Sequence, residues 1–311
     1  MWKLNNQKNR ANGSTGNKHA LKIDKAEEHA LRAFSPAYAL TLPKTIETPL
    51  ILASPHSGRL YPRGFLDQTS LSQTELRLSE DSYVDHIFHP LTKLGIPFLQ
   101  ALFPRCYVDV NRSATEWPPE SISPPPHEIS PRAKAGLGVI PTRIAQNLNI
   151  YKHPLLAKHI QARLDALYHP YHAALTTCIE TTKAKIGNAV LLDCHSMPGL
   201  LATGQKRADI ILGDQFGKTC HPDTIHILQT KLQSLGYAVI RNIPYAGGFV
   251  TAHYGQPDMA VEAIQIEINK DLYLNPLTLE PHADMAKICE DMQLAITHLA
   301  KTLQTTPIAA Q

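Results

Sequence analysis

Two short, uninterrupted apolar runs constrain the fold of this chain more than any other feature of its sequence. Residues 49–53 read PLILA and lead into SPHSG at 54–58, while residues 189–192 read AVLL and lead into DCHS at 193–196. Strands that are apolar on both faces are typical of parallel sheets covered by helices on each side. The two runs therefore predict central strands of an α/β sheet.

Helical and strand patterns alternate along the rest of the chain. Helical periodicity covers approximately residues 73–95, 152–185, 222–235 and 283–304, and shorter strand patterns lie at 97–102, 106–110, 208–213, 237–241 and 262–269. This alternation predicts an α/β fold with a mostly parallel, mixed central sheet and helices on both of its faces.

The composition is that of a globular protein, because 311 residues with 43% hydrophobic and 18% charged side chains can bury a sizeable core. We expect residues 1–20, which are rich in Asn, Gly and Lys and show no periodicity, to form a flexible tail, and residues 21–311 to form a single domain. The Pro-rich stretch at 113–135 is expected to be an irregular excursion. Its length suits a lid over a binding site, and equally a surface insertion without a role.

Charge and cysteine usage argue against several classes of partner. The net charge is +3, but residues 1–32 carry +4, which leaves −1 for the rest of the chain. Such a body lacks the clustered basic surface that nucleic acid or an anionic membrane requires, and no apolar run approaches the ~18 residues of a membrane-spanning helix. The five cysteines show no paired spacing that would indicate a disulfide framework. The N-terminal cations are not followed by the apolar core of a secretory signal. We expect a cytoplasmic protein with a small-molecule partner.

His56 and His195 each stand directly after an apolar run, where open α/β sheets bind ligands. With 16 histidines in the chain, a single one is more often structural, but two at equivalent strand ends predict a shared metal site. Zinc accepts imidazole and carboxylate ligands and, in hydrolytic sites, keeps one position open for water. Glu80, Asp81 and Asp85 lie on a helical pattern and offer a third ligand, although they also suit a solvated acidic helix face.

Glu267 lies on a strictly alternating strand pattern, with Gln265 and Asn269 on its own face. A carboxylate on so apolar a strand is costly to bury unless it is paired, hydrogen-bonded or catalytic. Beside a metal it would deprotonate a water molecule and pass the proton to a leaving nitrogen. The alternative is the solvent-facing side of an edge strand.

The segment 109–112, Asp-Val-Asn-Arg, is expected to follow a short strand led by Arg105. Arginine binds a carboxylate with two parallel hydrogen bonds, and a neighbouring Asn adds a neutral donor, so the segment indicates a substrate that carries a carboxylate. A lone arginine is more often a surface cation. Two glycine clusters, 136–138 and 247–248, would let the backbone approach a ligand closely, although ordinary turns also explain them.

Together these motifs resemble the N-formylglutamate amidohydrolase (N-formylglutamate deformylase) family. The motifs, in chain order, are residues 54–58, Asp81 with 84–85, 109–112, 136–138, 193–199, 213–214, 247–248 and 265–269. The family is similar in fold and chemistry to zinc carboxypeptidases and aspartoacylases. The resemblance thus implies a zinc carboxypeptidase-like (phosphorylase/hydrolase-like) fold and metal-dependent hydrolysis of the amide of N-formyl-L-glutamate to formate and L-glutamate.

The resemblance also implies a set of metal ligands and a general base. His56 and His195 would bind a divalent metal, Zn, and Glu267 would be the general base. The carboxypeptidase-like pattern has a Glu where this chain has Arg59, so a third ligand must come from elsewhere, and Asp81 is our choice over the two neighbouring acids.

Substrate contacts follow from the same resemblance. Asn111 and Arg112 would bind a substrate carboxylate, and Arg105 would help to stabilise the oxyanion. A substrate with two carboxylates needs a second cation, for which Arg143 and Lys270 are the candidates. Lys270 stands where many relatives have Arg, which leaves the preference for glutamate open. The backbone at Gly247 and Gly248 completes the expected binding site.

Three other interpretations of the sequence remain open. The same metal core would serve a hydrolase of another N-acyl amino acid or of a small peptide. A non-catalytic binding protein on the same fold would account for Arg59. A Ser57 or Cys194 nucleophile is less favoured, because no Gly-x-Ser-x-Gly elbow is present and Cys194 directly precedes His195 on a strand, where adjacent side chains point to opposite faces.

Overall fold

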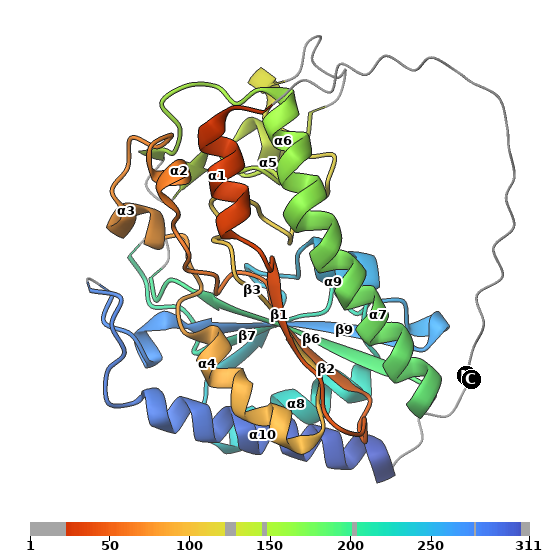
Figure 1. Ribbon diagram of the computed structural model, residues 1–311. Helices are drawn as coiled ribbons and strands as arrows, with labels where there is room; N and C mark the ends of the chain where they lie inside the picture. Colours follow the sequence, from red (N-terminus) through yellow and green to blue (C-terminus); the bar gives the residue numbers. More distant parts are fainter. Residues whose placement is uncertain (1–22, 122–128, 145–147, 201–203, 277, 306–311) are drawn as a thin grey trace, which may run out of the picture.

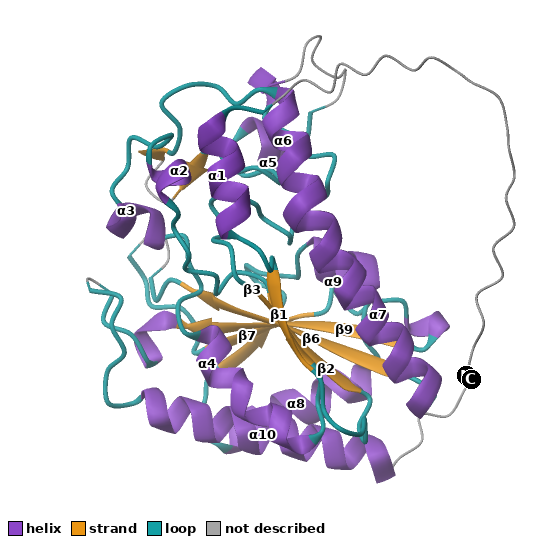
Figure 2. Ribbon diagram, in the orientation of Figure 1, coloured by secondary structure: helices purple, strands orange, loops and turns teal. Residues whose placement is uncertain are grey.

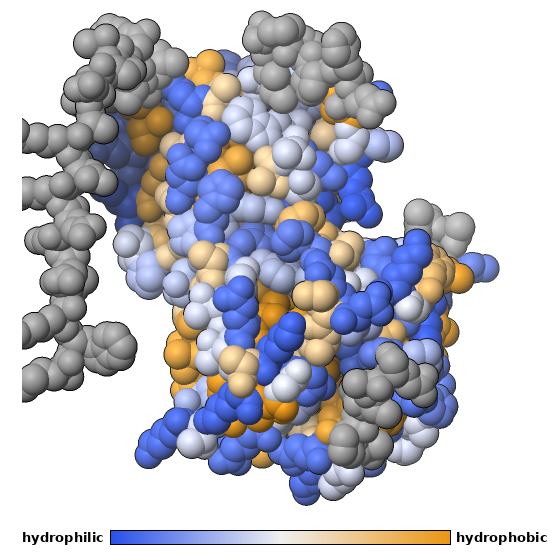
Figure 3. Space-filling model, turned by 90° about the vertical axis from the view of Figure 1, so that its right-hand side faces the viewer, coloured by the Kyte–Doolittle hydropathy of each residue, from blue (hydrophilic) through white to orange (hydrophobic). Residues whose placement is uncertain are grey.

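The computed structural model describes residues 23–121, 129–144, 148–200, 204–276 and 278–305. The expected tail of residues 1–20 lies outside these residues, as does the part of the Pro-rich excursion at 122–128. The division into a tail and one domain therefore stays a prediction. No helix among the described residues is long and apolar enough to cross a membrane. On the face drawn in Figure 3, hydrophilic residues are interspersed with small apolar patches.

A mixed sheet forms the centre of the fold, with the strand order β1-β3-β2-β6-β9-β7-β8 among the described residues (Figures 1 and 2). The strands are β1 (Tyr38–Thr41), β2 (Leu50–Ser54), β3 (Phe98–Ala101), β6 (Ala189–Met197), β7 (Ile210–Gly213), β8 (Val239–Arg241) and β9 (Val261–Asn269). The four strands β3, β2, β6 and β9 run parallel, β1 and β7 are antiparallel to their neighbours β3 and β9, and β8 runs parallel to β7. The predicted mostly parallel, mixed sheet is confirmed. A separate small pair joins β4 (Arg143–Ile144) to β5 (Leu148–Asn149).

Helices cover both faces of this sheet, as the sequence pattern predicts (Figure 1). One face carries α1 (Lys25–Ala33), α6 (Ala157–Arg163), α7 (His169–Ile186) and α9 (Phe249–Tyr254), and the other carries α4 (Val84–Phe88), α8 (Pro222–Ser234) and α10 (Met285–Thr305). The short helices α2 (Arg63–Leu66), α3 (Gln73–Arg77) and α5 (Pro131–Lys134) lie between the longer elements in sequence. Side chains alternate along β6, so Leu191 packs into the first layer and Leu192 into the second. Both strands predicted from apolar runs, β2 and β6, are buried over their whole length.

Two elements expected from the sequence are wrong, one in the segment that contains Asp81 and one in the segment that contains Asp109. The helix expected over 73–95 is interrupted at 78–83, because the N–H of Asp81 donates to the carbonyl of His56 at 3.0 Å instead of continuing a helix. The strand expected at 106–110 is a turn, in which the carbonyl of Pro104 accepts from the N–H of Tyr107 at 2.9 Å. Asp81 and Asp109 are thus loop residues.

A buried ion pair ties α1 to α6 beneath this turn. Both Arg163 and Glu27 are fully buried, and the guanidinium donates to the two carboxylate oxygens at 2.7 and 2.8 Å. It also donates to the hydroxyl of Tyr151 at 2.6 Å and stacks on the ring of Tyr107, with its carbon 3.8 Å from the ring centre. The pair therefore supports the backbone that leads into Asp109.

Candidate metal centre and active-site cavity

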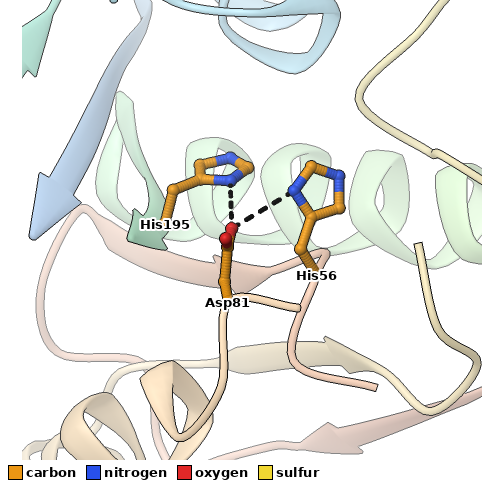
Figure 4. A group of neighbouring side chains, drawn as sticks. All are labelled: His56, Asp81 and His195. Atoms are coloured by element: carbon orange, nitrogen blue, oxygen red, sulfur yellow. Dashed lines mark hydrogen bonds and ion pairs between the residues drawn. The ribbon is translucent and has the colours of Figure 1, made fainter. Parts of the chain in front are cut away.

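Two histidines and one aspartate converge at the carboxyl edge of the parallel strands. His56 follows β2 and His195 lies near the end of β6, and the parallel pairing of these strands places both at one edge of the sheet. Figure 4 shows the carboxylate of Asp81 pointing toward both rings: its Oδ2 lies 3.0 Å from Nδ1 of His195 and 3.3 Å from Nδ1 of His56. One ligand atom from each residue lies within 4.8 Å of the others, and all three residues are buried.

A further carboxylate bonds to the other ring nitrogen of each histidine. Nε2 of His56 bonds to Asp109 at 2.8 Å, and Nε2 of His195 bonds to Asp193 at 2.9 Å. In the neutral tautomer that donates from Nε2, the lone pair of each Nδ1 faces Asp81. Metal-binding histidines are commonly oriented by such carboxylates. Two imidazole nitrogens and one carboxylate oxygen, each ring anchored in this way, fit a divalent metal.

The charges around these rings favour a bound cation. Burial alone would raise the pKa of Asp81, but hydrogen bonds from His195 and His56 hold it below the ordinary value. Burial also opposes the charged form of His195, yet Asp193 and Asp81 raise its pKa well above the ordinary value. The carboxylates therefore attract positive charge to the point where the rings meet, and a divalent ion can replace the proton there.

Of the three acids considered for the third ligand position, the structure brings Asp81 alone to the histidines. Asp85 is paired with Arg59, whose Nη2 lies 2.7 Å from its carboxylate. Glu80 accepts from the hydroxyl of Tyr61 at 2.7 Å and from that of Ser82 at 2.8 Å. Arg59, which occupies the place of the expected ligand, thus removes a competing carboxylate.

Glu267 lies on β9 directly opposite His195 of β6. Because β9 is flanked by β6 and β7, the edge-strand alternative is wrong for this residue. Its carboxylate accepts from the side-chain amide of Gln265 at 2.8 Å and is 7% exposed as a residue. Burial raises the pKa of Glu267 to about 7, a value suited to taking and returning a proton near neutral pH.

Asn111 is fixed between the histidine site and the glycine loop. Its side-chain oxygen accepts from the N–H of Val250 at 2.8 Å, and its Nδ2 lies 3.2 Å from Nε2 of His195. A Cβ on Gly248 would lie 2.4 Å from the Asn111 amide, so only glycine allows this approach. The N–H of Gly248 in turn donates to Gln265 at 2.8 Å.

The arginines of this region differ in how they are held. Nη2 of Arg105 donates to the second oxygen of Asp109 at 2.9 Å; burial would lower the pKa of Arg105, but the carboxylates of Asp109 and Asp81 raise it. Arg112 donates to two carbonyls, that of Leu137 at 3.0 Å and that of Asn111 at 2.8 Å. Both guanidinium groups are thereby oriented.

Lys270 begins a short turn after β9, and its Nζ donates to the carbonyl of Glu80. Burial lowers the pKa of Lys270, while the charges of Asp81 and Glu267 act in the opposite direction. Lys270 therefore lies at the same end of the site as these two carboxylates.

These side chains surround one cavity of about 460 Å³. All eleven residues selected from the sequence line it: His56, Asp81, Arg105, Asn111, Arg112, Arg143, His195, Gly247, Gly248, Glu267 and Lys270. Sequence reasoning missed the ring anchors Asp109 and Asp193. The position of Asp193, two residues before His195 on one strand face, was a usable signal. It also missed Arg132 and Tyr245, which line the cavity from loop and short-helix positions without a periodic pattern.

Comparisons with known proteins give matches over most of this chain. Residues 48–274 match the family model described as N-formylglutamate amidohydrolase. An N-formylglutamate deformylase from Pseudomonas aeruginosa is 27% identical over 263 residues, which cover 82% of this chain and 92% of that protein, and one from Pseudomonas putida is 24% identical over the same length. The crystal structure of an N-formylglutamate amidohydrolase from Ralstonia eutropha JMP134 matches with a TM-score of 0.81 and 32% identity, covering 86% of this chain and 99% of that one.

Proposed function

The chain belongs to the N-formylglutamate amidohydrolase family, and on that premise we propose that it hydrolyses N-formyl-L-glutamate to formate and L-glutamate. The observation that carries this proposal is the buried group of His56, Asp81 and His195, with Glu267 beside it in a cavity lined by cations. The cavity offers ligands for a metal, a base and positive charge for carboxylates within one space. Metal-assisted hydrolysis of a small anionic amide uses all three.

His56, Asp81 and His195 would hold the metal, for which we propose zinc because their donor set is that of hydrolytic zinc sites. When bound, such an ion supplies Lewis-acid activation of water and of the amide carbonyl. Asp109 and Asp193 keep the Nδ1 atom of each ring directed to that point.

Glu267 moves the proton in this proposal. Its carboxylate takes a proton from the attacking water and delivers it to the amide nitrogen, which leaves as the amino group of glutamate. Arg105, held by Asp109, stabilises the negative charge that develops on the carbonyl oxygen.

The remaining cations bind the substrate. Arg112, Arg143 and Lys270 line the cavity and supply positive charge for the two carboxylates of N-formylglutamate, and Asn111 adds an amide donor. The backbone of Gly247 and Gly248 lies along the same wall. The substrate is thus a small N-acyl amino acid, and we propose the cytoplasm as the place of action.

The test is an assay for formate release from N-formyl-L-glutamate by the purified full-length chain, with and without a chelator. We expect release that the chelator abolishes and that added zinc restores. A matched panel of N-acetyl-L-glutamate and small peptides measures the acyl preference. Absence of formate release from the zinc-loaded protein would exclude the proposed reaction, and faster turnover of another N-acyl substrate would transfer the proposal to that compound.

A further inference from the structure

Arg132 lines the cavity but has no part in the mechanism above. It lies on α5, a single turn that begins at Pro131 after the capping residue Ser130, whose hydroxyl accepts from the N–H of Ala133 at 3.1 Å. Ala133 is buried, which anchors the turn. The backbone beneath Arg132 is therefore fixed, while its long side chain is exposed.

Arg112 is attached to the same segment. Its Nε donates to the carbonyl of Leu137, just after α5, so the two arginines approach the cavity from adjoining backbone. Asp109 favours the charged form of Arg112, but burial and the charges of Arg105 and Arg132 outweigh it and lower the pKa of Arg112. Arg112 and Arg132 are thus close enough to repel each other.

Asp109 neutralises this pair only weakly, because its Oδ2 lies 4.0 Å from Nε of Arg112, at the limit of an ion pair. Both oxygens of Asp109 are already in use, one with His56 and the other with Arg105. Within the described ranges, the side chain of Arg132 makes no ion pair or hydrogen bond. Two adjacent guanidinium groups that face a cavity form a site for an anion, above all for a planar carboxylate.

We propose that Arg132 is a specificity-determining residue that binds, together with Arg112, the side-chain carboxylate of a dicarboxylic substrate. The inference rests on the proposed function. In N-formylglutamate the side-chain carboxylate is further along the bonded chain from the formyl group than the α-carboxylate is. Lys270 donates to the carbonyl of Glu80, beside the buried Asp81, whereas Arg132 is an exposed residue of the same cavity lining. The pair of Arg112 and Arg132 therefore reaches the open end of the cavity. The more distant carboxylate therefore matches this pair.

The test compares two substrates that differ only in that carboxylate, N-formyl-L-glutamate and N-formyl-L-glutamine, with the zinc-loaded full chain. Arg132→Gln should raise KM for the glutamate compound about 10- to 100-fold, the effect expected from losing charged hydrogen bonds, while kcat and the constants for the glutamine compound change less than about threefold. Arg132→Lys should recover part of the affinity, since it restores the charge without the fork. Lys134→Gln, on the same turn but outside the cavity lining, is the matched control and should have no effect.

Equal losses for both substrates, or no loss for either, would overturn the inference. Calorimetric titration with L-glutamate and L-glutamine separates it from the proposed function, because binding needs no turnover. If the wild-type chain releases no formate, the proposed reaction fails, yet a selective loss of L-glutamate affinity in Arg132→Gln would still support the role of Arg132. If the wild-type chain does not prefer L-glutamate, or the variant retains that preference, the inference is wrong.

Discussion

Arg163→Met should destabilise the fold strongly at neutral pH and much less in acid. The substitution removes two hydrogen bonds from a guanidinium to the fully buried Glu27. Among the described residues, Tyr107 at 2.6 Å and Gln68 at 3.1 Å are the side-chain donors that remain. Breaking a buried pair in this way costs about 3–5 kcal/mol, because the remaining charge has no compensation. We expect a loss of that size in the free energy of unfolding at pH 7.

The sign of the pH dependence follows from the pKa of Glu27. In the wild-type chain, burial alone would raise this pKa, but hydrogen bonds and charge from Arg163 lower it below the ordinary value. The pair therefore contributes stability above the unfolded-state pKa of about 4.3, and that contribution is lost as the pH falls through the lower folded-state value. Without Arg163, burial raises the pKa of Glu27, so the variant gains stability relative to the wild type as the carboxyl group takes up its proton.

Urea unfolding followed by circular dichroism between pH 4 and 8 measures both effects. The destabilisation should be largest at neutral pH and shrink steadily toward acid. The double variant Glu27→Gln/Arg163→Met is the control, because removing both charges should restore most of the lost stability. A destabilisation below about 1 kcal/mol, or one that does not change with pH, would refute the assignment of a stabilising charge pair here.

Three further predictions concern the cavity. Glu267→Gln should leave the zinc content unchanged and lower the rate of formate release by roughly 10²- to 10⁴-fold, so near-normal turnover would remove Glu267 from the mechanism. Asp193→Asn should weaken zinc binding about 10- to 100-fold, measured by competition with a chromogenic chelator, and an unchanged affinity would contradict its role as the anchor of His195. Gly248→Ala places a methyl group against the side-chain amide of Asn111, so it should lower the free energy of unfolding by about 1–3 kcal/mol and also lower kcat/KM. Urea titration and the formate assay measure the two effects, and unchanged values would show that the loop can move to accommodate the methyl group.

The sequence predicted that His56, His195 and Glu267 lie at one site, because the position of each depends on strand pattern. An apolar run followed by a polar residue marks a strand end, and parallel strands bring their ends together, so His56 and His195 could be placed without a structure. Strict alternation likewise placed Glu267 on one face of its strand.

The third acid could not be placed in the same way. Asp81 and Asp85 share a helical spacing, yet a hydrogen bond from the Asp81 backbone to His56, distant in sequence, breaks the helix between them. Local spacing carries no information about such a contact, nor about Arg59 pairing with Asp85. The strand expected before Asp109 is absent for a different reason: its residues are apolar enough for a strand, but the N–H of Tyr107 bonds locally to the carbonyl of Pro104. A tertiary contact decided the first case, and a local turn decided the second.

Asp109 joins two parts of the cavity that would otherwise be studied separately. One of its oxygens accepts from His56 and the other from Arg105, so replacing either partner changes the charge that the other experiences. The free-energy effects of substitutions at His56 and Arg105 should therefore not sum to the effect of the double substitution. A residue-by-residue scan of this wall would count the same interaction twice, and only a thermodynamic cycle would apportion it.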